Sequence, residues 1–115
     1  MRESVRNDLR KIEAWLRKKF ATPYPVRVIV RRIARKEKAR ATTERVGKRI
    51  VITINERLNW DLAVDCLLHE FAHAVDFRHE SVERRRPDHD DQWALAYGKV
   101  YRSFWDEGGR EEAGV

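Results

Sequence analysis

The sequence of 115 residues predicts a single α+β domain: an N-terminal helix, a small three-stranded sheet and two further helices. Apolar residues recur at helical spacing in three segments, near residues 4–20, 58–77 and 91–106. Between the first two of these segments, apolar and polar residues alternate, as in strands with one buried face. A chain of this length can bury one modest core, so we expect one domain.

The first helix is predicted over residues 4–20, with Arg and Lys filling the side opposite its apolar stripe. The stripe consists of Val5, Leu9, Ile12, Leu16 and Phe20. Trp15 lies beside the stripe and is assigned to the core. Pro23 and Pro25 then end the helix, because proline lacks an amide hydrogen and restricts the residue before it.

Three strands are predicted to follow the first helix. The first covers residues 26–34, where valines alternate with arginines. A second lies within residues 35–46 and pairs through a turn at Gly47 with the third, residues 48–54, which has isoleucine at every second position. Strands that follow one another this closely predict a small sheet, with the next helix packed across it.

The second helix is predicted over residues 58–77, LNWDLAVDCLLHEFAHAVDF, which contain no Lys or Arg. Apolar residues cover most of its circumference, so we expect other elements to surround it. Asn59 is suited to cap its N-terminus, and Asp61 favours its positive end. Its one polar stripe consists of Asp61, Asp65, His69, His73 and Asp76.

This stripe contains the motif HExxH. His69 and His73 are one turn apart on a helix and can bind the same metal ion. Glu70 is rotated by about 100° from His69, so its carboxylate flanks the ion and suits a base acting on metal-activated water. A catalytic zinc site takes three protein ligands and leaves one position for water. A third ligand is therefore expected elsewhere in the chain.

His79 is one alternative for the third ligand. It follows His73 by six residues, which is the spacing of the metzincin pattern HExxHxxGxxH. However, Asp76 stands where that pattern has glycine, and a left-handed turn there would be strained. Metzincins also need a downstream methionine turn, and the only methionine here is Met1.

His89 is the other histidine available. Fifteen residues separate it from His73, and it directly precedes the last predicted helix, where the chain can fold back over the site. Carboxylate ligands are further alternatives, since some zinc peptidases use a downstream glutamate; these are Glu80 and Glu83.

Three motifs together resemble the SprT-like (Spartan-type) zinc metalloprotease domain: the strand RIVITIN, the helix segment HEFAHAVDF and the segment HDDQW that begins at His89. The resemblance spans about residues 48–105. In that family a third histidine opens the next helix in an HGxxW/F pattern, and this chain departs from it at Asp90, where glycine is common. The chain resembles phage-borne and bacterial minimal forms of this domain.

The resemblance implies a minimal zincin-like fold in which His69, His73 and His89 hold zinc and the last helix carries the third ligand. It implies that Glu70 is the catalytic base of a zinc-dependent endopeptidase. It further implies protein substrates held on or near DNA. The alternative function is a non-catalytic, zinc-stabilised module that binds nucleic acid or protein.

The last helix is predicted from residue 90 or 91 to residue 106, and the tail, residues 107–115, is expected to be mobile. The SprT-like domain is thus expected to span residues 1–106. The predicted buried side of the helix consists of Trp93, Ala94, Tyr97, Val100, Tyr101, Phe104 and Trp105. Two of these residues, Tyr97 and Tyr101, are candidates to stabilise an oxyanion, and two aspartates, Asp65 and Asp76, are candidates to orient the histidines.

Charge is distributed unevenly along the chain. Residues 1–49 hold 17 Lys and Arg against 5 Asp and Glu, a net charge of +12, and residues 50–115 hold 8 against 14, a net charge of −6. The basic half suggests attraction to nucleic acid, with an ordinary solvated surface as the alternative. No apolar run is long enough to span a membrane, the start resembles no signal peptide, and Cys66 is the only cysteine. These features predict a cytoplasmic protein without disulfides.

Overall fold

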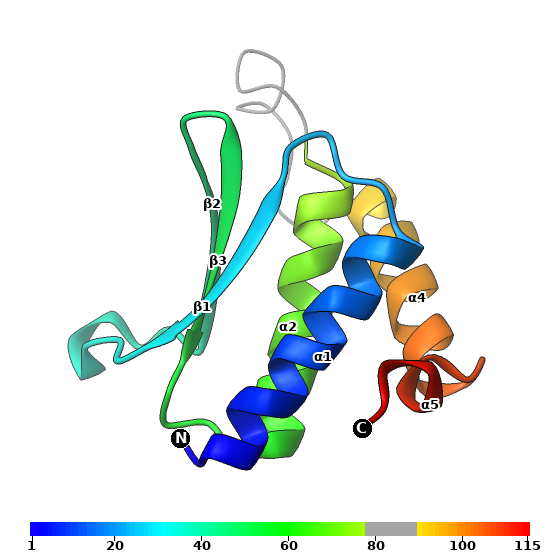
Figure 1. The fold of residues 1–115 in the computed structure, drawn as a ribbon. Helices are drawn as coiled ribbons and strands as arrows, with labels where there is room; N and C mark the ends of the chain where they lie inside the picture. Colours follow the sequence, from blue (N-terminus) through cyan, green and yellow to red (C-terminus); the bar gives the residue numbers. More distant parts are fainter. Residues whose placement is uncertain (78–89) are drawn as a thin grey trace.

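The structure is a computed structural model that describes residues 1–77 and 90–115. It has two layers, a three-stranded sheet and a group of helices on one side of it (Figure 1). The elements in chain order are α1 (Glu3–Lys19), β1 (Val26–Arg31), the 3-10 helix η1 (Arg35–Glu37), β2 (Ala41–Val46), β3 (Arg49–Asn55), α2 (Trp60–Val75), α4 (Asp91–Trp105) and α5 (Gly109–Ala113). The predicted α+β class and the three-stranded sheet are confirmed.

The central strand of the sheet is β3, in the order β1-β3-β2. β1 runs parallel to β3, with Val26 opposite Ile50, and β2 runs antiparallel to it, with Thr43 opposite Ile52. The turn between β2 and β3 contains Gly47, whose φ of 62° lies in the left-handed region that favours glycine. The first strand ends at Arg31 rather than at residue 34, and η1 follows it.

The core lies between the sheet and the helices. The alternate isoleucines of β3 are completely buried beneath them; these are Ile50, Ile52 and Ile54. In Figure 1, α1 and α2 lie side by side, and the Trp60 indole of α2 donates a 3.0 Å hydrogen bond to Asp8 of α1. The Asn59 side chain accepts from the Leu62 amide at 3.0 Å, which confirms the predicted cap.

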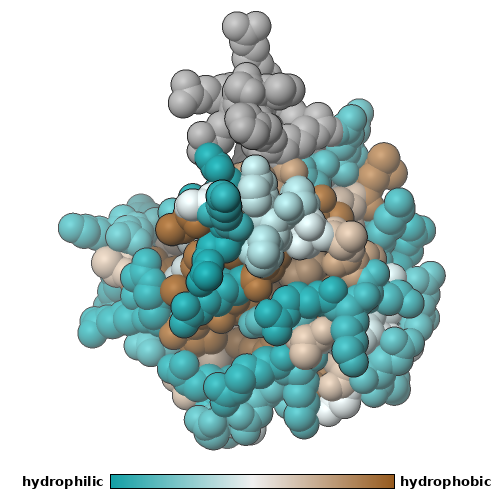
Figure 2. All heavy atoms as spheres, turned by 45° about the horizontal axis from the view of Figure 1, so that its top comes forward, coloured by the Kyte–Doolittle hydropathy of each residue, from teal (hydrophilic) through white to brown (hydrophobic). Residues whose placement is uncertain are grey.

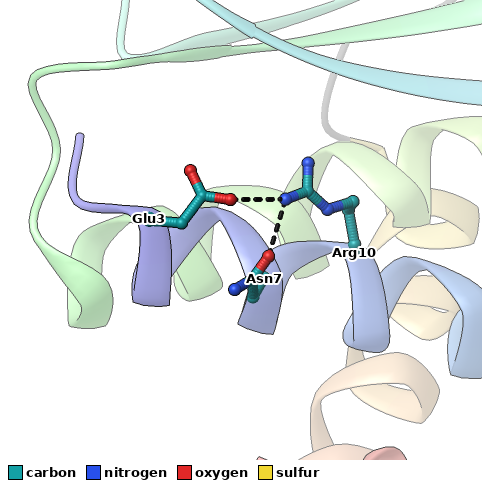
Figure 3. A network of polar contacts seen from close by, with 3 residues as sticks. All are labelled: Glu3, Asn7 and Arg10. Carbon is teal, nitrogen blue, oxygen red and sulfur yellow. Dashed lines mark hydrogen bonds and ion pairs between the residues drawn. The ribbon is translucent and has the colours of Figure 1, made fainter.

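The surface is strongly polar. Hydrophilic side chains cover most of the face seen in Figure 2, with smaller apolar areas between them. On α1, Arg10 contacts Asn7 at 2.6 Å and Glu3 at 3.1 Å (Figure 3), but all three are exposed, so the contribution to stability is small. None of the helices in residues 1–77 and 90–115 has the length and apolar character needed to cross a membrane.

The buried side of α4 is narrower than the sequence suggests. Val100 and Phe104 are completely buried, and Ser103 is also buried. Ala94 and Tyr101, both predicted to be buried, are instead exposed. The physical reason is that α4 packs against α2 and α5, and its remaining side is left to solvent in the part of the chain that the structure describes.

Residues 109–113 do not form the mobile tail expected from the sequence. They form α5, whose first residue, Gly109, is buried against Trp15 of α1. The Trp15 indole also donates a 3.0 Å hydrogen bond to Glu112. The physical reason for the difference is that glycine, which has no Cβ, allows the backbone to approach the Trp15 ring closely.

Replacement of Gly109 by alanine should therefore destabilise the fold. A Cβ there would lie 2.5 Å from the Ser103 carbonyl oxygen and would overlap the Trp15 ring, so we expect a loss of about 1–3 kcal/mol in the free energy of unfolding. The matched control is Gly98→Ala in the interior of α4, where a Cβ meets nothing within 4 Å and should stabilise the helix by about 0.5–1 kcal/mol. Urea denaturation measures both, and equal stability of Gly109→Ala and the parent would contradict the close packing.

Candidate metal centre

The α2 helix presents His69 and His73 on one face. Their ring centroids are 5.1 Å apart, and both side chains are half-buried. Ligand atoms of His69, Glu70 and His73 all lie within 4.8 Å of one another. Residues four positions apart on a helix lie about one turn apart on the same face, and this brings the two imidazoles close enough to bind one ion.

The carboxylate of Glu70 lies between the imidazole of His69 and the β2 strand, and it contacts both. Glu70 is only 9% exposed, and its Oε1 accepts a 3.0 Å hydrogen bond from the Thr43 hydroxyl of β2. The same hydroxyl lies 3.2 Å from the Glu70 backbone oxygen. The other carboxylate oxygen, Oε2, lies 3.7 Å from Nε2 of His69. The sheet therefore fixes one oxygen of the carboxylate and directs the other toward the histidines.

Two aromatic side chains of α4 pack against the histidine pair. Trp93 stacks on His73 with centroids 5.1 Å apart and an interplanar angle of 26°, and it lies 4.9 Å from His69. Tyr97 stacks on Trp93 at 5.1 Å and lies 5.5 Å from His69. The N-terminus of α4 is capped by Asp90, whose side chain accepts from the Trp93 amide at 3.0 Å. The first turns of α4 therefore pack against one side of the two imidazole rings.

A pocket of about 450 Å³ opens beside this group. On the α2 side, its wall consists of Leu62, Asp65, Cys66, His69 and Glu70. The facing wall comes from the segment that leads into β2, with Lys38, Arg40 and Ala41, and Tyr97 of α4 completes the lining. Although Glu70 is buried, it is thus part of the wall of a pocket that is large enough for water and a ligand.

Two groups in this pocket have shifted pKa values. Burial raises the pKa of the Tyr97 hydroxyl, and the negative charge of Asp65 adds to the rise. Tyr97 therefore stays protonated at neutral pH and can donate a hydrogen bond. Burial also raises the pKa of the Cys66 thiol, and the charge of Glu70 raises it further. Cys66 both packs against the core and borders the pocket.

Some of the site residues predicted from the sequence border the pocket, and others do not or lie outside the described residues. His89, the predicted third ligand, lies outside the described residues, as do its alternatives, His79, Glu80 and Glu83. Of the two tyrosines, Tyr97 borders the pocket, whereas Tyr101 is 40% exposed and is not part of the lining. Asp65 also borders the pocket, and Asp76 is the C-cap residue of α2.

Sequence reasoning missed two residues of this group. The sequence predicts Thr43 only as part of a strand, and its contact with Glu70 depends on the register, which places it opposite the buried Ile52 on the inward face of β2. The sequence predicts Trp93 on the buried side of its helix but does not predict its contact with the histidines. The sequence signal for this contact is that Trp93 lies three residues after the cap residue Asp90, in the first turn of α4.

The donor set fits a metal ion such as zinc. Two imidazole nitrogens and a carboxylate oxygen are ligand types that zinc accepts, and they already lie within 4.8 Å of one another. The Thr43 hydroxyl satisfies one carboxylate oxygen and keeps the group in place. Comparisons with protein-family models, curated proteins and solved structures give no significant match to this chain.

The raised pKa of Cys66 predicts the pH dependence of its alkylation. Because the folded state disfavours the thiolate, the midpoint of the rate of reaction with iodoacetamide should lie at higher pH in the native protein than in urea. The rates should be measured over a pH series with a chelator present, so that metal binding does not interfere. Steric protection alone would lower the rate without moving the midpoint. A native midpoint equal to or below that of the unfolded chain would contradict the environment described for Cys66.

Proposed function

We propose that this protein is a zinc-dependent endopeptidase of the SprT-like type. The observation that carries the proposal is the Glu70 carboxylate, which is held by Thr43 beside His69 and His73 at the wall of an open pocket. A buried carboxylate at this position has no evident value for packing, because burial of a charge costs free energy. Beside a metal ion and water, the same group can act as a base.

His69, His73 and His89 are the proposed ligands. The first turns of α4 pack on the two histidines of α2 through Trp93, and His89 directly precedes Asp90, the N-cap residue of α4. This packing favours His89 over His79, in agreement with the pattern of the family that the sequence resembles. Zinc at such a site supplies a Lewis acid that acidifies water and polarises a carbonyl group.

In the proposed reaction, Glu70 accepts a proton from the attacking water and passes it to the nitrogen of the leaving amine. Thr43 donates to Oε1 of Glu70, and Oε2, which lies 3.7 Å from Nε2 of His69, is the oxygen proposed to take the proton. Tyr97 can donate its hydroxyl hydrogen to the carbonyl oxygen of the substrate as negative charge develops there. Trp93 covers the imidazoles on the side of α4 and fixes their orientation.

The substrate backbone is proposed to pair with β2. This strand forms one edge of the sheet, and Thr43 in its middle contacts Glu70. An extended peptide that adds to such an edge forms main-chain hydrogen bonds that depend little on sequence. The basic N-terminal half is proposed to hold the enzyme near DNA, where its protein substrates would lie.

A second candidate function is a non-catalytic module in which zinc joins α2 to α4. The stacking of Trp93 on His73 favours it, because the two helices already meet at the histidines. The carboxylate of Glu70 discriminates between the two functions, since a structural site needs no base.

Glu70→Gln should abolish cleavage and leave zinc binding intact. The amide keeps the shape of the side chain and an oxygen for Thr43, but it cannot take a proton, so we expect cleavage of an unfolded protein substrate to fall by about a hundredfold to ten-thousandfold. Zinc content by mass spectrometry and thermal stability should stay near those of the parent. The matched control is Glu44→Gln, an exposed residue of the same strand as Thr43 that faces away from the site. Unchanged cleavage in Glu70→Gln, or none in the parent with or without DNA, would refute the enzymatic function.

His89→Ala should lower zinc content, and His79→Ala should not. Loss of one of three ligands weakens binding strongly, whereas a histidine outside the site has no effect on it. Zinc should be measured after dialysis against a weak chelator, with His69→Ala as the positive control for loss. If His79→Ala alone loses zinc, His79 replaces His89 as the third ligand.

A further inference from the structure

The pocket beside the histidines extends toward the N-terminal end of α2. Leu62, Cys66 and His69 lie at successive turns of that helix and all border it, whereas His73 does not. A peptide bound at Glu70 would therefore place in this pocket a side chain from one side of the cleaved bond. The pocket is large enough for one amino-acid side chain, with room for water.

The wall facing α2 carries two cations, Lys38 and Arg40. Their segment is fixed to the end of β3, because Asn55 donates from its backbone to the Arg40 carbonyl at 2.8 Å and from its side chain to the Ala39 carbonyl at 3.2 Å. The Lys38 amide caps η1 by donating to the Arg35 carbonyl at 3.1 Å. Two positively charged residues of the pocket lining are thus attached to a backbone that is held by hydrogen bonds to β3 and η1.

The charged side chains on the two walls of the pocket differ in the contacts that they already make. In residues 1–77 and 90–115, Lys38 and Arg40 form no ion pair. On the α2 side, Glu70 is engaged by Thr43, and Asp65 is exposed to solvent. A ligand group between these walls meets the two cations on one side, and on the other the carboxylates of Asp65 and Glu70 together with Leu62, Cys66 and His69. Because Asp65 is exposed to water and Glu70 accepts from Thr43, the two cations are the charges that remain for a ligand to engage.

We propose that this pocket selects substrates with an acidic side chain next to the cleaved bond, whose carboxylate is bound by Lys38 and Arg40. The inference rests on the proposed peptidase function and adds the class of substrate. A single carboxylate fits because charge-assisted hydrogen bonds from both cations can reach it. A nucleic-acid backbone fits less well, since its successive phosphates would bring several negative charges toward Asp65 and Glu70, whereas an acidic side chain brings only one.

Binding tests the inference independently of cleavage. Fluorescein-labelled alanine hexapeptides with two central glutamates, glutamines or lysines are titrated with the full chain carrying Glu70→Gln, and anisotropy is recorded. We expect the glutamate peptide to bind at least about fivefold more tightly than the glutamine peptide. Further replacement by Lys38→Glu and Arg40→Glu should reverse the order in favour of the lysine peptide. The control pair, Lys48→Glu and Arg49→Glu, makes the same change of charge outside the pocket and should preserve the preference.

Cleavage supplies the second measurement. The wild-type chain is incubated with a peptide library, and the new termini are identified by mass spectrometry. We expect Asp and Glu to be enriched at one position on one side of the cleaved bond, and this enrichment should be lost in the Lys38→Glu, Arg40→Glu variant. Cleavage without any acidic preference would overturn the inference and leave the peptidase function standing.

Other outcomes separate the two proposals. Equal binding of the glutamate and glutamine peptides, or a preference that survives charge reversal, would overturn the acidic pocket. So would a hexathymidine oligonucleotide that binds more tightly than the glutamate peptide and loses affinity on charge reversal of Lys38 and Arg40. Absence of cleavage with the binding preference intact would refute the peptidase and support an acidic-peptide site.

Discussion

The hydrogen bond between Thr43 and Glu70 is the contact on which the candidate site depends. A carboxylate that is 9% exposed is costly to bury unless a donor compensates for the water it loses. The Thr43 hydroxyl is such a donor, at 3.0 Å. It also joins the edge strand of the sheet to the helix that carries both histidines, so the position of Glu70 is set by the packing of α2 on the sheet.

The rest of the site follows from how the helices cover one another. α2 packs against the sheet and against α4, and the two histidines of its polar stripe lie in the seam where α2 meets α4. Trp93 and Tyr97 line this seam and contact the imidazoles. The pocket remains open toward the N-terminal end of α2, where Leu62 is partly exposed instead of buried in the core. Although most of the surface of α2 is apolar and buried, the side of the helix that borders the pocket therefore stays accessible to solvent.

Local patterns in the sequence were sufficient to predict the three longer helices and the three strands. Helical spacing, the cap at Asn59 and the alternating isoleucines of β3 each depend on neighbours a few residues apart, and the structure agrees with all three. The pair His69 and His73 is similarly local, because helix geometry alone brings them together.

Features that depend on distant contacts could not be predicted. The contact of Thr43 with Glu70 joins residues 27 positions apart and requires the strand order and register, which a periodic pattern does not specify. The segment after residue 106 reads as a polar tail, and only its partner, Trp15, shows why Gly109 begins a helix there. The acidic and basic walls of the pocket likewise meet only after the chain has folded.

The two-residue connection between β2 and β3 has a consequence for the order of assembly. Such a hairpin closes the shortest loop in the sheet, on a timescale of about 1–10 μs in isolated hairpins. The parallel pairing of β1 with β3 must instead bring together segments separated by the whole of β2, which costs more chain entropy. The strand that bears Thr43 can therefore acquire its partner early, and the packing of α2 on this preformed hairpin would be the step that assembles the candidate site.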